Sequence, residues 1–208
     1  AEGSLDNFSS KDNSLYHLYS PPVNKPIPYV EYQHQIAELG GNSDKKNLPL
    51  VLIQMKENLG FTGGNNVGIR FALANNATYI WLLNNDTIVS RNCLNEMIST
   101  IESDSNIGIV GSKIYFAHQK NLIWFAGAKF NRYFGQSIMT GFSKVDDEKS
   151  WEIDIESAFI TGCSMLIKAE VLHEIGLLDD DYFFGMEDLD FGIRVNNIFL
   201  RCVVSRKS

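Results

Sequence analysis

The chain has 208 residues, of which 44% are hydrophobic and 12% aromatic, and it carries a formal net charge of -7. This length suits one domain with a sizeable core, and the acidic balance, with no stretch rich in lysine and arginine, excludes a nucleic-acid partner. No apolar run approaches the roughly 18 residues that cross a bilayer, and the start of the chain lacks the regions of a signal peptide. We therefore expect no transmembrane segment, and a place in the cytoplasm or peripherally at the inner face of the membrane.

A proline-rich stretch lies in the first quarter of the chain. All five prolines fall within residues 21–49, which predicts a loop-rich insertion at about 20–48 with room for a short helix. Next come Leu50–Ile53 and Tyr79–Leu83, short apolar runs typical of strands covered on both faces of a parallel sheet. Between these runs the pattern predicts a helix at about 66–76. A strand, a helix and a second strand form a right-handed crossover, so we expect a doubly wound sheet.

The rest of the chain continues this alternation of helices and strands. The expected elements are a helix carrying Leu94, Met97, Ile98 and Ile101, a strand at 107–110, an apolar run at 165–167, and a helix at about 169–175 that stops at Gly176. We predict one α/β domain over residues 1–208, with a mostly parallel central sheet flanked by helices.

The first candidate for chemistry is the end of the second predicted strand, where the sequence turns abruptly polar at Asn84-Asn85-Asp86. Ligands of open α/β sheets bind beyond the carboxyl ends of strands, so Asn84 and Asp86 are expected to face a site. Oxygen ligands there suit Mg²⁺ or Mn²⁺, held partly by substrate phosphates. The alternative is an Asx turn that caps the next helix, and the local sequence leaves both open.

The second candidate is the segment 57–68, Glu-Asn-Leu-Gly-Phe-Thr-Gly-Gly-Asn-Asn-Val-Gly. Its glycine spacing does not fit the dinucleotide fingerprint, and no Gly-Lys-Ser/Thr follows, which excludes a Rossmann or P-loop site. One remaining interpretation is a loop that leads into a helix, whose free N–H groups bind an anion or a polar ligand. The other is a strand-to-helix turn that needs glycine for its backbone conformation.

The third candidate is the acidic segment 183–190, Phe-Phe-Gly-Met-Glu-Asp-Leu-Asp, at the start of a predicted helix. Asp190 precedes Arg194 by four residues, the favourable order for an ion pair along a helix. Glu187 and Asp188 have no such local partner. Because carboxylates beside bulky apolar side chains have a raised proton affinity, this pair is the candidate for a general base.

Together these segments resemble the inverting family 2 glycosyltransferases of the GT-A (nucleotide-diphospho-sugar transferase) fold, in particular the bacterial rhamnosyltransferase-like branch that builds surface polysaccharide. The resemblance runs from Asp6 to about Val204. It implies that Glu187 and Asp188 form the family's catalytic Glu-Asp pair, in which Asp188 takes the proton from the acceptor hydroxyl. It also implies that Asp86 holds the metal. The positions it implies for binding the nucleotide sugar are Asp6, Asn7, Asn58, Gly60, Gly64, Asn65, Asn84, Asn85 and Gly162.

Each of these matches has a place in the family's pattern. The segment that begins at Asp6 resembles the one whose aspartate holds the nucleoside, and residues 58–68 resemble the one that closes over the base and ribose. Asn84-Asn85-Asp86 takes the place of the Asp-x-Asp metal motif, with asparagine first, and residues 160–167 resemble the stretch that lines the donor sugar. Several ordered matches together are far more specific than any one of them.

The resemblance implies a single displacement at the anomeric carbon, with a divalent cation (Mg²⁺ or Mn²⁺) at the leaving diphosphate. The implied donor is dTDP-rhamnose, and the implied acceptor is a saccharide or a lipid-linked saccharide. The family normally has a Val/Ile-rich strand before the position of Leu5 and a histidine shortly after that of Ser208. We therefore expect this chain to be a family member trimmed at both ends.

Two other functions compete with sugar transfer. A nucleotidyltransferase could use a similar α/β core, acidic metal site and nucleotide, but it would usually show a Gly-rich phosphate loop bearing Arg or Lys near its start. A non-catalytic module that binds nucleotide sugar or glycan would need the same pocket without turnover. Nucleotide binding measured together with release of nucleoside diphosphate distinguishes these alternatives.

Overall fold

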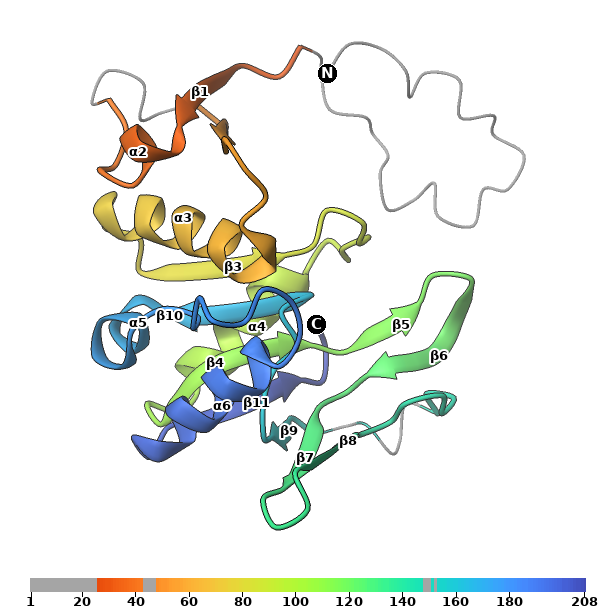
Figure 1. Cartoon of the computed structure of the whole chain (residues 1–208). Helices are drawn as coiled ribbons and strands as arrows, with labels where there is room; N and C mark the ends of the chain where they lie inside the picture. Colours follow the sequence, from red (N-terminus) through yellow and green to blue (C-terminus); the bar gives the residue numbers. More distant parts are fainter. Residues whose placement is uncertain (1–25, 43–47, 148–150, 152) are drawn as a thin grey trace.

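The computed structural model describes residues 26–42, 48–147, 151 and 153–208, and its centre is a five-stranded sheet in the order β3-β10-β4-β11-β9 (Figure 1). Each of the three inner strands is an apolar run whose residues are almost all buried. The strands of this sheet are β3 (Tyr79–Leu83), β4 (Ile107–Ser112), β9 (Ile155–Ser157), β10 (Ser164–Lys168) and β11 (Arg201–Ser205).

The sheet is more mixed than the mostly parallel one that we predicted. Strands β3, β4 and β11 run in one direction, but β10 lies antiparallel between β3 and β4, and β9 lies antiparallel beside β11. Strands β9 and β10 thus run in the same direction, opposite to the other three, and residues 158–163 join them without a crossover helix. The predicted α/β class with flanking helices is confirmed.

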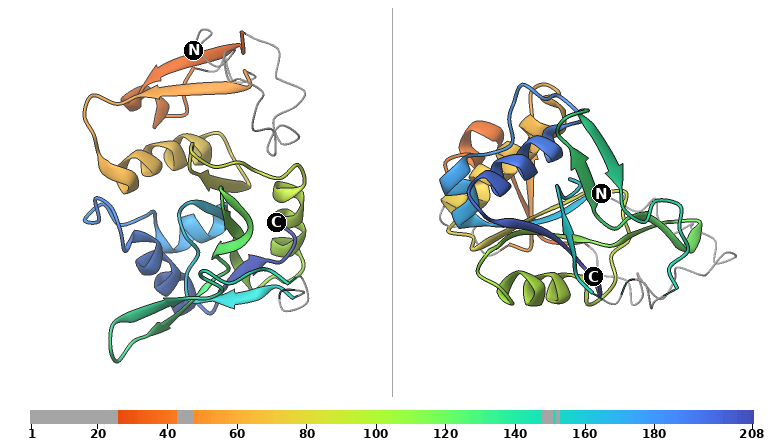
Figure 2. Two further views of the ribbon diagram at one scale, coloured as in Figure 1. Left: turned by 90° about the vertical axis from the view of Figure 1, so that its right-hand side faces the viewer. Right: turned by 90° about the horizontal axis from the view of Figure 1, so that it is seen from below.

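Helices cover both faces of this sheet (Figure 2). Alternate strand residues such as Ile109 and Met165 contact three helices on one face, whereas Val110 and Leu166 contact a single helix on the other. This period of two is what strands buried on both faces require. The three helices are α3 (Gly60–Ala74), α5 (Ala169–Ile175) and α6 (Glu187–Asn197), and the single helix is α4 (Cys93–Glu102).

The predicted insertion is more regular than expected, because it contains β1 (Tyr29–Gln33) and the short α2 (His34–Ala37). Strand β1 pairs in parallel with β2 (Leu50–Gln54), and both views place this pair on the far side of α3 from β3 (Figures 1 and 2). The expected crossover that joins β2 and β3 in one sheet is therefore wrong for the described residues. Coverage of β2 on both faces is also wrong, since Leu50 and Leu52 are 39% and 40% exposed.

Two antiparallel hairpins extend from the sheet (Figure 1). They follow β4 directly, and the turn of the second hairpin exposes Tyr133 and Phe134. The strands of the first are β5 (Ile114–Phe116) and β6 (Gln119–Phe125), and those of the second are β7 (Ala128–Asn131) and β8 (Gln136–Met139). None of the helices in the part of the chain described is long and apolar enough to cross a membrane.

Candidate active site

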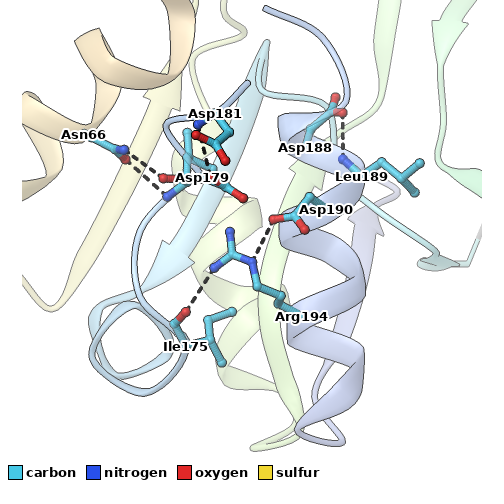
Figure 3. Close-up of polar contacts among 9 residues, drawn as sticks. Asn66, Ile175, Asp179, Asp181, Asp188, Leu189, Asp190 and Arg194 are labelled. Atoms are coloured by element: carbon cyan, nitrogen blue, oxygen red, sulfur yellow. Dashed lines mark hydrogen bonds and ion pairs between the residues drawn. The ribbon is translucent and has the colours of Figure 1, made fainter. Parts of the chain in front are cut away.

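Asp188 lies in the first turn of α6, immediately after a tight bend. Gly185 and Met186 both have positive φ, at +89° and +73°. A methionine in this left-handed region is strained, and such strain persists where the surroundings fix the backbone. The bend ends the apolar 183–184 segment and allows α6 to begin at Glu187. The carboxylates of Glu187 and Asp188 therefore both lie in the first turn of this helix. Figure 3 shows Asp188 accepting the backbone N–H of Leu189, at 2.8 Å.

The electrostatics of this pair favour a proton on Asp188 at mildly acid pH. Burial, together with the nearby Glu187 carboxylate, raises the pKa of Asp188 from 3.8 to about 6, although the backbone N–H groups of Leu189 and Gly162 oppose the shift. Glu187 is only 6% exposed, and its Oε2 has no hydrogen-bond partner among the described residues. A carboxyl group with a pKa near 6 is a carboxylate at neutral pH and still accepts a proton readily, as a general base must.

Asp190 has a structural role, as its spacing predicted. Its carboxylate pairs with the Arg194 guanidinium at 2.7 Å, and that guanidinium also donates to the backbone oxygen of Ile175 at the end of α5 (Figure 3). This ion pair ties α6 to α5. Of the three acidic residues in the first turn of α6, Asp190 is therefore the one whose carboxylate is used in a structural ion pair.

Gly162, in the turn between β9 and β10, brings the predicted segments together. Its N–H lies beside the Asp188 carboxylate, and a Cβ built on it would come within 2.6 Å of the Phe61 ring. The backbone oxygen of the next residue, Cys163, accepts a hydrogen bond from the backbone N–H of Asn84 at 3.0 Å. One turn thus joins the start of α6, the start of α3 and the end of β3, and only glycine leaves room for the ring of Phe61.

The start of α3 lies against the loop before α6. Gly60 has a φ of +72°, and a Cβ on it would lie 2.3 Å from the backbone oxygen of Phe183. That same oxygen accepts the N–H of Phe61 at 2.9 Å, while the side chain of Asn58 accepts the N–H of Gly60. These contacts start the helix at Gly60. The prediction of a loop up to about residue 66 is therefore wrong, because tertiary contacts outweigh the low helix propensity of glycine.

The other positions predicted in this segment lie on the helix itself. Gly64 is exposed, with open space around its Cα, and Asn65 donates to the backbone oxygen of Phe61 at 2.8 Å. Gly64 is exposed and Asn65 is partly exposed, so both remain candidate contacts for a ligand. Asp6 and Asn7 lie outside the described residues.

The end of β3 presents the predicted metal segment as a turn. Thr87 donates its hydroxyl to the backbone oxygen of Asn84 at 2.7 Å, and Asn85 and Asp86 are exposed. Burial and the nearby Asp86 carboxylate raise the pKa of the Cys163 thiol, so Asp86 faces the same turn as Gly162. No cluster of three metal-ligating side chains occurs among the described residues. A single exposed carboxylate fits a cation that takes its other ligands from substrate phosphates and water.

Two cavities flank the segment 161–164. The Asp86 cavity, of about 380 Å³, is lined by Asp86, Cys163 and Ser164 and by residues of β3 and β5. The Asp188 cavity, of about 650 Å³, is lined by Asp188, Thr161 and residues of the β6 and β8 strands. The chain thus has a metal-compatible carboxylate on one side of the turn and a base-compatible carboxylate on the other.

Asn66 is an anchor of the site that sequence reasoning missed. It is buried in α3, where its amide donates to the backbone oxygen of Leu178 at 2.8 Å and to the carboxylate of Asp180 at 2.7 Å. Its side-chain oxygen accepts the N–H of Leu178 at 3.2 Å. These bonds hold the loop before α6 against α3 (Figure 3). A buried asparagine in an otherwise apolar helical stripe was the only signal in the sequence.

A protein-family model for glycosyl transferase family 2 matches residues 31–176, well over half of the chain. The chain belongs to this family. The matched range runs from β1 to the end of α5 and includes both the Asn84-Asn85-Asp86 turn and Gly162. Asp188 lies beyond it, so its place in this family 2 chain rests on the geometry of α6. No curated protein matches the chain.

One solved structure supports the fold independently. The chain is similar to a crystal structure of GalNAc-T7 with UDP, GalNAc and Mn²⁺, with a TM-score of 0.54 and 12% identity over 76% of this chain. It spans 31% of the length of that structure. It also resembles A197 from STIV, with a TM-score of 0.46 and 12% identity over 85% of this chain and 78% of the other. The fold of this family 2 chain is GT-A, as predicted.

Proposed function

We propose that this protein transfers a sugar from a nucleotide-diphosphate donor to an acceptor hydroxyl, with inversion at the anomeric carbon. The observation that carries the proposal is the placement of Asp188. Its carboxylate lies half-buried at the wall of a cavity of about 650 Å³, with its pKa raised to about 6, and Gly162 links it to the Asp86 turn. Membership of family 2 and the GT-A fold support the same reaction.

Asp188 accepts the acceptor proton in this proposal. The acceptor oxygen forms the new bond to the anomeric carbon, the bond from that carbon to the diphosphate oxygen breaks, and the nucleoside diphosphate leaves with the electron pair. Attack opposite to the leaving group inverts the carbon in one step, and no covalent enzyme intermediate is needed. Burial of Asp188, and in second place the charge of the nearby Glu187 carboxylate, raise its proton affinity and keep it basic enough for this role.

Asp86 is the residue that would hold Mg²⁺ or Mn²⁺, together with the donor's own phosphates. When bound, such a cation neutralises charge that develops on the leaving diphosphate. The crystallised GalNAc-T7 contained Mn²⁺ and UDP, which supports a divalent cation and a nucleoside diphosphate here. The start of α3, with Asn58, Gly60, Gly64 and Asn65, would contribute to the nucleotide side together with Asn84 and Asn85. Gly162 would line the donor sugar.

The donor that we propose is dTDP-rhamnose, and the role is surface polysaccharide synthesis. Both come from the rhamnosyltransferase-like pattern of Asn84-Asn85-Asp86 and Glu187-Asp188 in the sequence. A panel of nucleotide sugars tests the choice, because a different sugar or base as the best donor would correct it without affecting the role of Asp188.

Calorimetry and turnover in the same preparation test the proposal. We expect dTDP or UDP to bind in the presence of Mn²⁺, and we expect free nucleoside diphosphate to form when the nucleotide sugar and an acceptor are added. Binding without release of nucleoside diphosphate would support a non-catalytic module. Release of pyrophosphate from a nucleoside triphosphate and a sugar phosphate would support a nucleotidyltransferase.

A further inference from the structure

The Asp188 cavity is open and its lining is largely apolar. Trp124 at the end of β6, Met139 at the end of β8, and Phe142 in the following turn form its outer walls, while Met186 lies next to the catalytic helix. Its volume of about 650 Å³ lies within the range of small-molecule sites, roughly 300–1,000 Å³. A compound of the size of one or two sugar rings therefore fits beside Asp188.

The aromatic walls are supported from behind. Phe142 is 45% exposed, and its ring stands edge-on to that of Phe116, with centroids 5.9 Å apart. The Trp124 ring lies 6.2 Å from that of Phe125, which is fully buried. Rings held in this way offer a flat surface whose position is set before any ligand binds, so little ordering cost is left for binding.

Polar groups occur only at a few points of the cavity. Thr161 and Ser137 supply hydroxyl groups, and Asp188 supplies the carboxylate. A hexopyranose matches this pattern, because its axial C–H groups make an apolar ring face while its hydroxyl groups lie at the edge. An aliphatic chain would use the apolar walls but would make no hydrogen bond to the two hydroxyl groups or to the Asp188 carboxylate while displacing their water, which carries a desolvation cost.

We propose that the Asp188 cavity is the acceptor subsite and that it selects a hexopyranose residue by stacking its apolar face on Trp124 and Phe142, with the attacking hydroxyl at Asp188. This inference rests on the proposed sugar transfer and names the class of acceptor that the transfer uses. The β7–β8 hairpin then sets acceptor specificity, since Ser137, Ile138 and Met139 form one wall.

Saturation-transfer NMR with simple probes tests the inference. The probes are methyl hexopyranosides of gluco, galacto, manno and 6-deoxy-manno configuration, octyl glucoside and 1-octanol, each added to protein with UDP and Mn²⁺. We expect at least one methyl glycoside to bind at millimolar concentration. Phe142→Ala should weaken that binding roughly three- to tenfold, and Phe142→Tyr should restore it, because aromatic stacking has about this strength.

The chain offers a matched control on the same hairpin. Tyr133 in the β7–β8 turn is 97% exposed and does not line the cavity, so Tyr133→Ala should leave binding unchanged. Trp124→Phe is a second test that keeps an aromatic ring, and a modest loss of affinity is expected. Thermal melting of each variant shows whether weaker binding comes from the missing aromatic ring or from unfolding of the protein.

The outcomes separate this inference from the proposed function. Intact UDP binding with no methyl glycoside bound, or with binding unaffected by Phe142→Ala, overturns the acceptor subsite alone. Binding of octyl glucoside only, displaced by 1-octanol, assigns the cavity to a lipid and also overturns it. Absence of nucleotide binding in the unmodified protein, in contrast, contradicts the proposed sugar transfer itself.

Discussion

Asp188→Asn should stabilise the protein at neutral pH. In the native state the pKa of Asp188 is raised from 3.8 to about 6. Above pH 6 the folded protein therefore contains a charged carboxylate that is less well solvated than it would be in water. The shift of about two units corresponds to about 3 kcal/mol at pH 7. Asparagine keeps the oxygen that accepts the Leu189 N–H but carries no charge. Removing the charge should therefore recover part of this free energy.

The sign of the pH dependence follows from the direction of the shift. Between about pH 4 and pH 6 the native state binds more protons at Asp188 than the unfolded state does, so stability falls as pH rises through this window. Above pH 6 and below about pH 4, the contribution of Asp188 to the free energy of unfolding does not change with pH. The advantage of Asp188→Asn should consequently be largest above pH 6 and shrink toward pH 4.

Thermal melting at pH 7.5 and pH 4.5 measures this difference. For a chain of this size about 3 kcal/mol corresponds to a rise of roughly 6–12 °C in Tm, as an upper bound. The matched control is Asp190→Asn, which removes the partner of Arg194 and should lower the Tm slightly. A Tm of Asp188→Asn that is equal to or below that of the unmodified protein at both pH values would refute the argument from burial.

Three further predictions follow from the same contacts. After burial, the Glu187 charge is the second cause of the raised pKa of Asp188, and Glu187→Gln removes that charge. The pH at which turnover is half-maximal, expected near 6, should therefore move lower, and an unchanged pH–rate profile would contradict this coupling. Asp86→Ala should abolish the metal-dependent part of the affinity for dTDP or UDP while leaving the Tm intact, since Asp86 is exposed; calorimetry with Mn²⁺ and with chelator checks it, and equal affinities in the unmodified chain would argue against a cation. Asn66→Ala should cost about 2–4 kcal/mol in the free energy of unfolding, because three hydrogen bonds are lost and the buried backbone N–H and C=O groups of Leu178 stay unsatisfied; urea denaturation measures it, and a loss no greater than that of the exposed Asn85→Ala would show that the anchor is unimportant.

The elements of the central domain could be predicted from periodicity. Apolar runs gave the strands at 79–83 and 107–110, and helical spacing gave the helices at 93–102 and 169–175. The position of β10 could not be predicted, because its neighbours in the sheet lie more than fifty residues earlier in the chain. The pattern of one strand contains nothing that specifies a partner so distant.

The errors in the site region have a common physical cause. The glycine-rich segment reads as a loop by propensity, yet Phe183 and Asn58 bind its first N–H groups and start a helix at Gly60. The partners of Asn66 lie more than a hundred residues further along the chain. Tertiary contacts of this kind override local preference and leave little trace in the local sequence.

The candidate segments of the site, by contrast, could be chosen from short motifs. Asn84-Asn85-Asp86 and Glu187-Asp188 were chosen because polar or acidic residues interrupt apolar runs there, and Gly162 was chosen through the family resemblance. The structure joins these three segments around one turn. What the motifs could not give is the environment of Asp188. Its burial and its proximity to Glu187 depend on the packing of α6 against the sheet.

The turnover of Asp188→Asn tests the central claim most directly. Sugar transfer from the nucleotide donor should fall roughly 10²- to 10⁴-fold, the range for removal of a general base, while donor affinity measured by calorimetry stays the same. Asp190→Asn, on the same helix turn, should retain most of its turnover, because its carboxylate is committed to Arg194. Near-normal turnover in Asp188→Asn, with turnover abolished in a folded Asp190→Asn, would contradict the account.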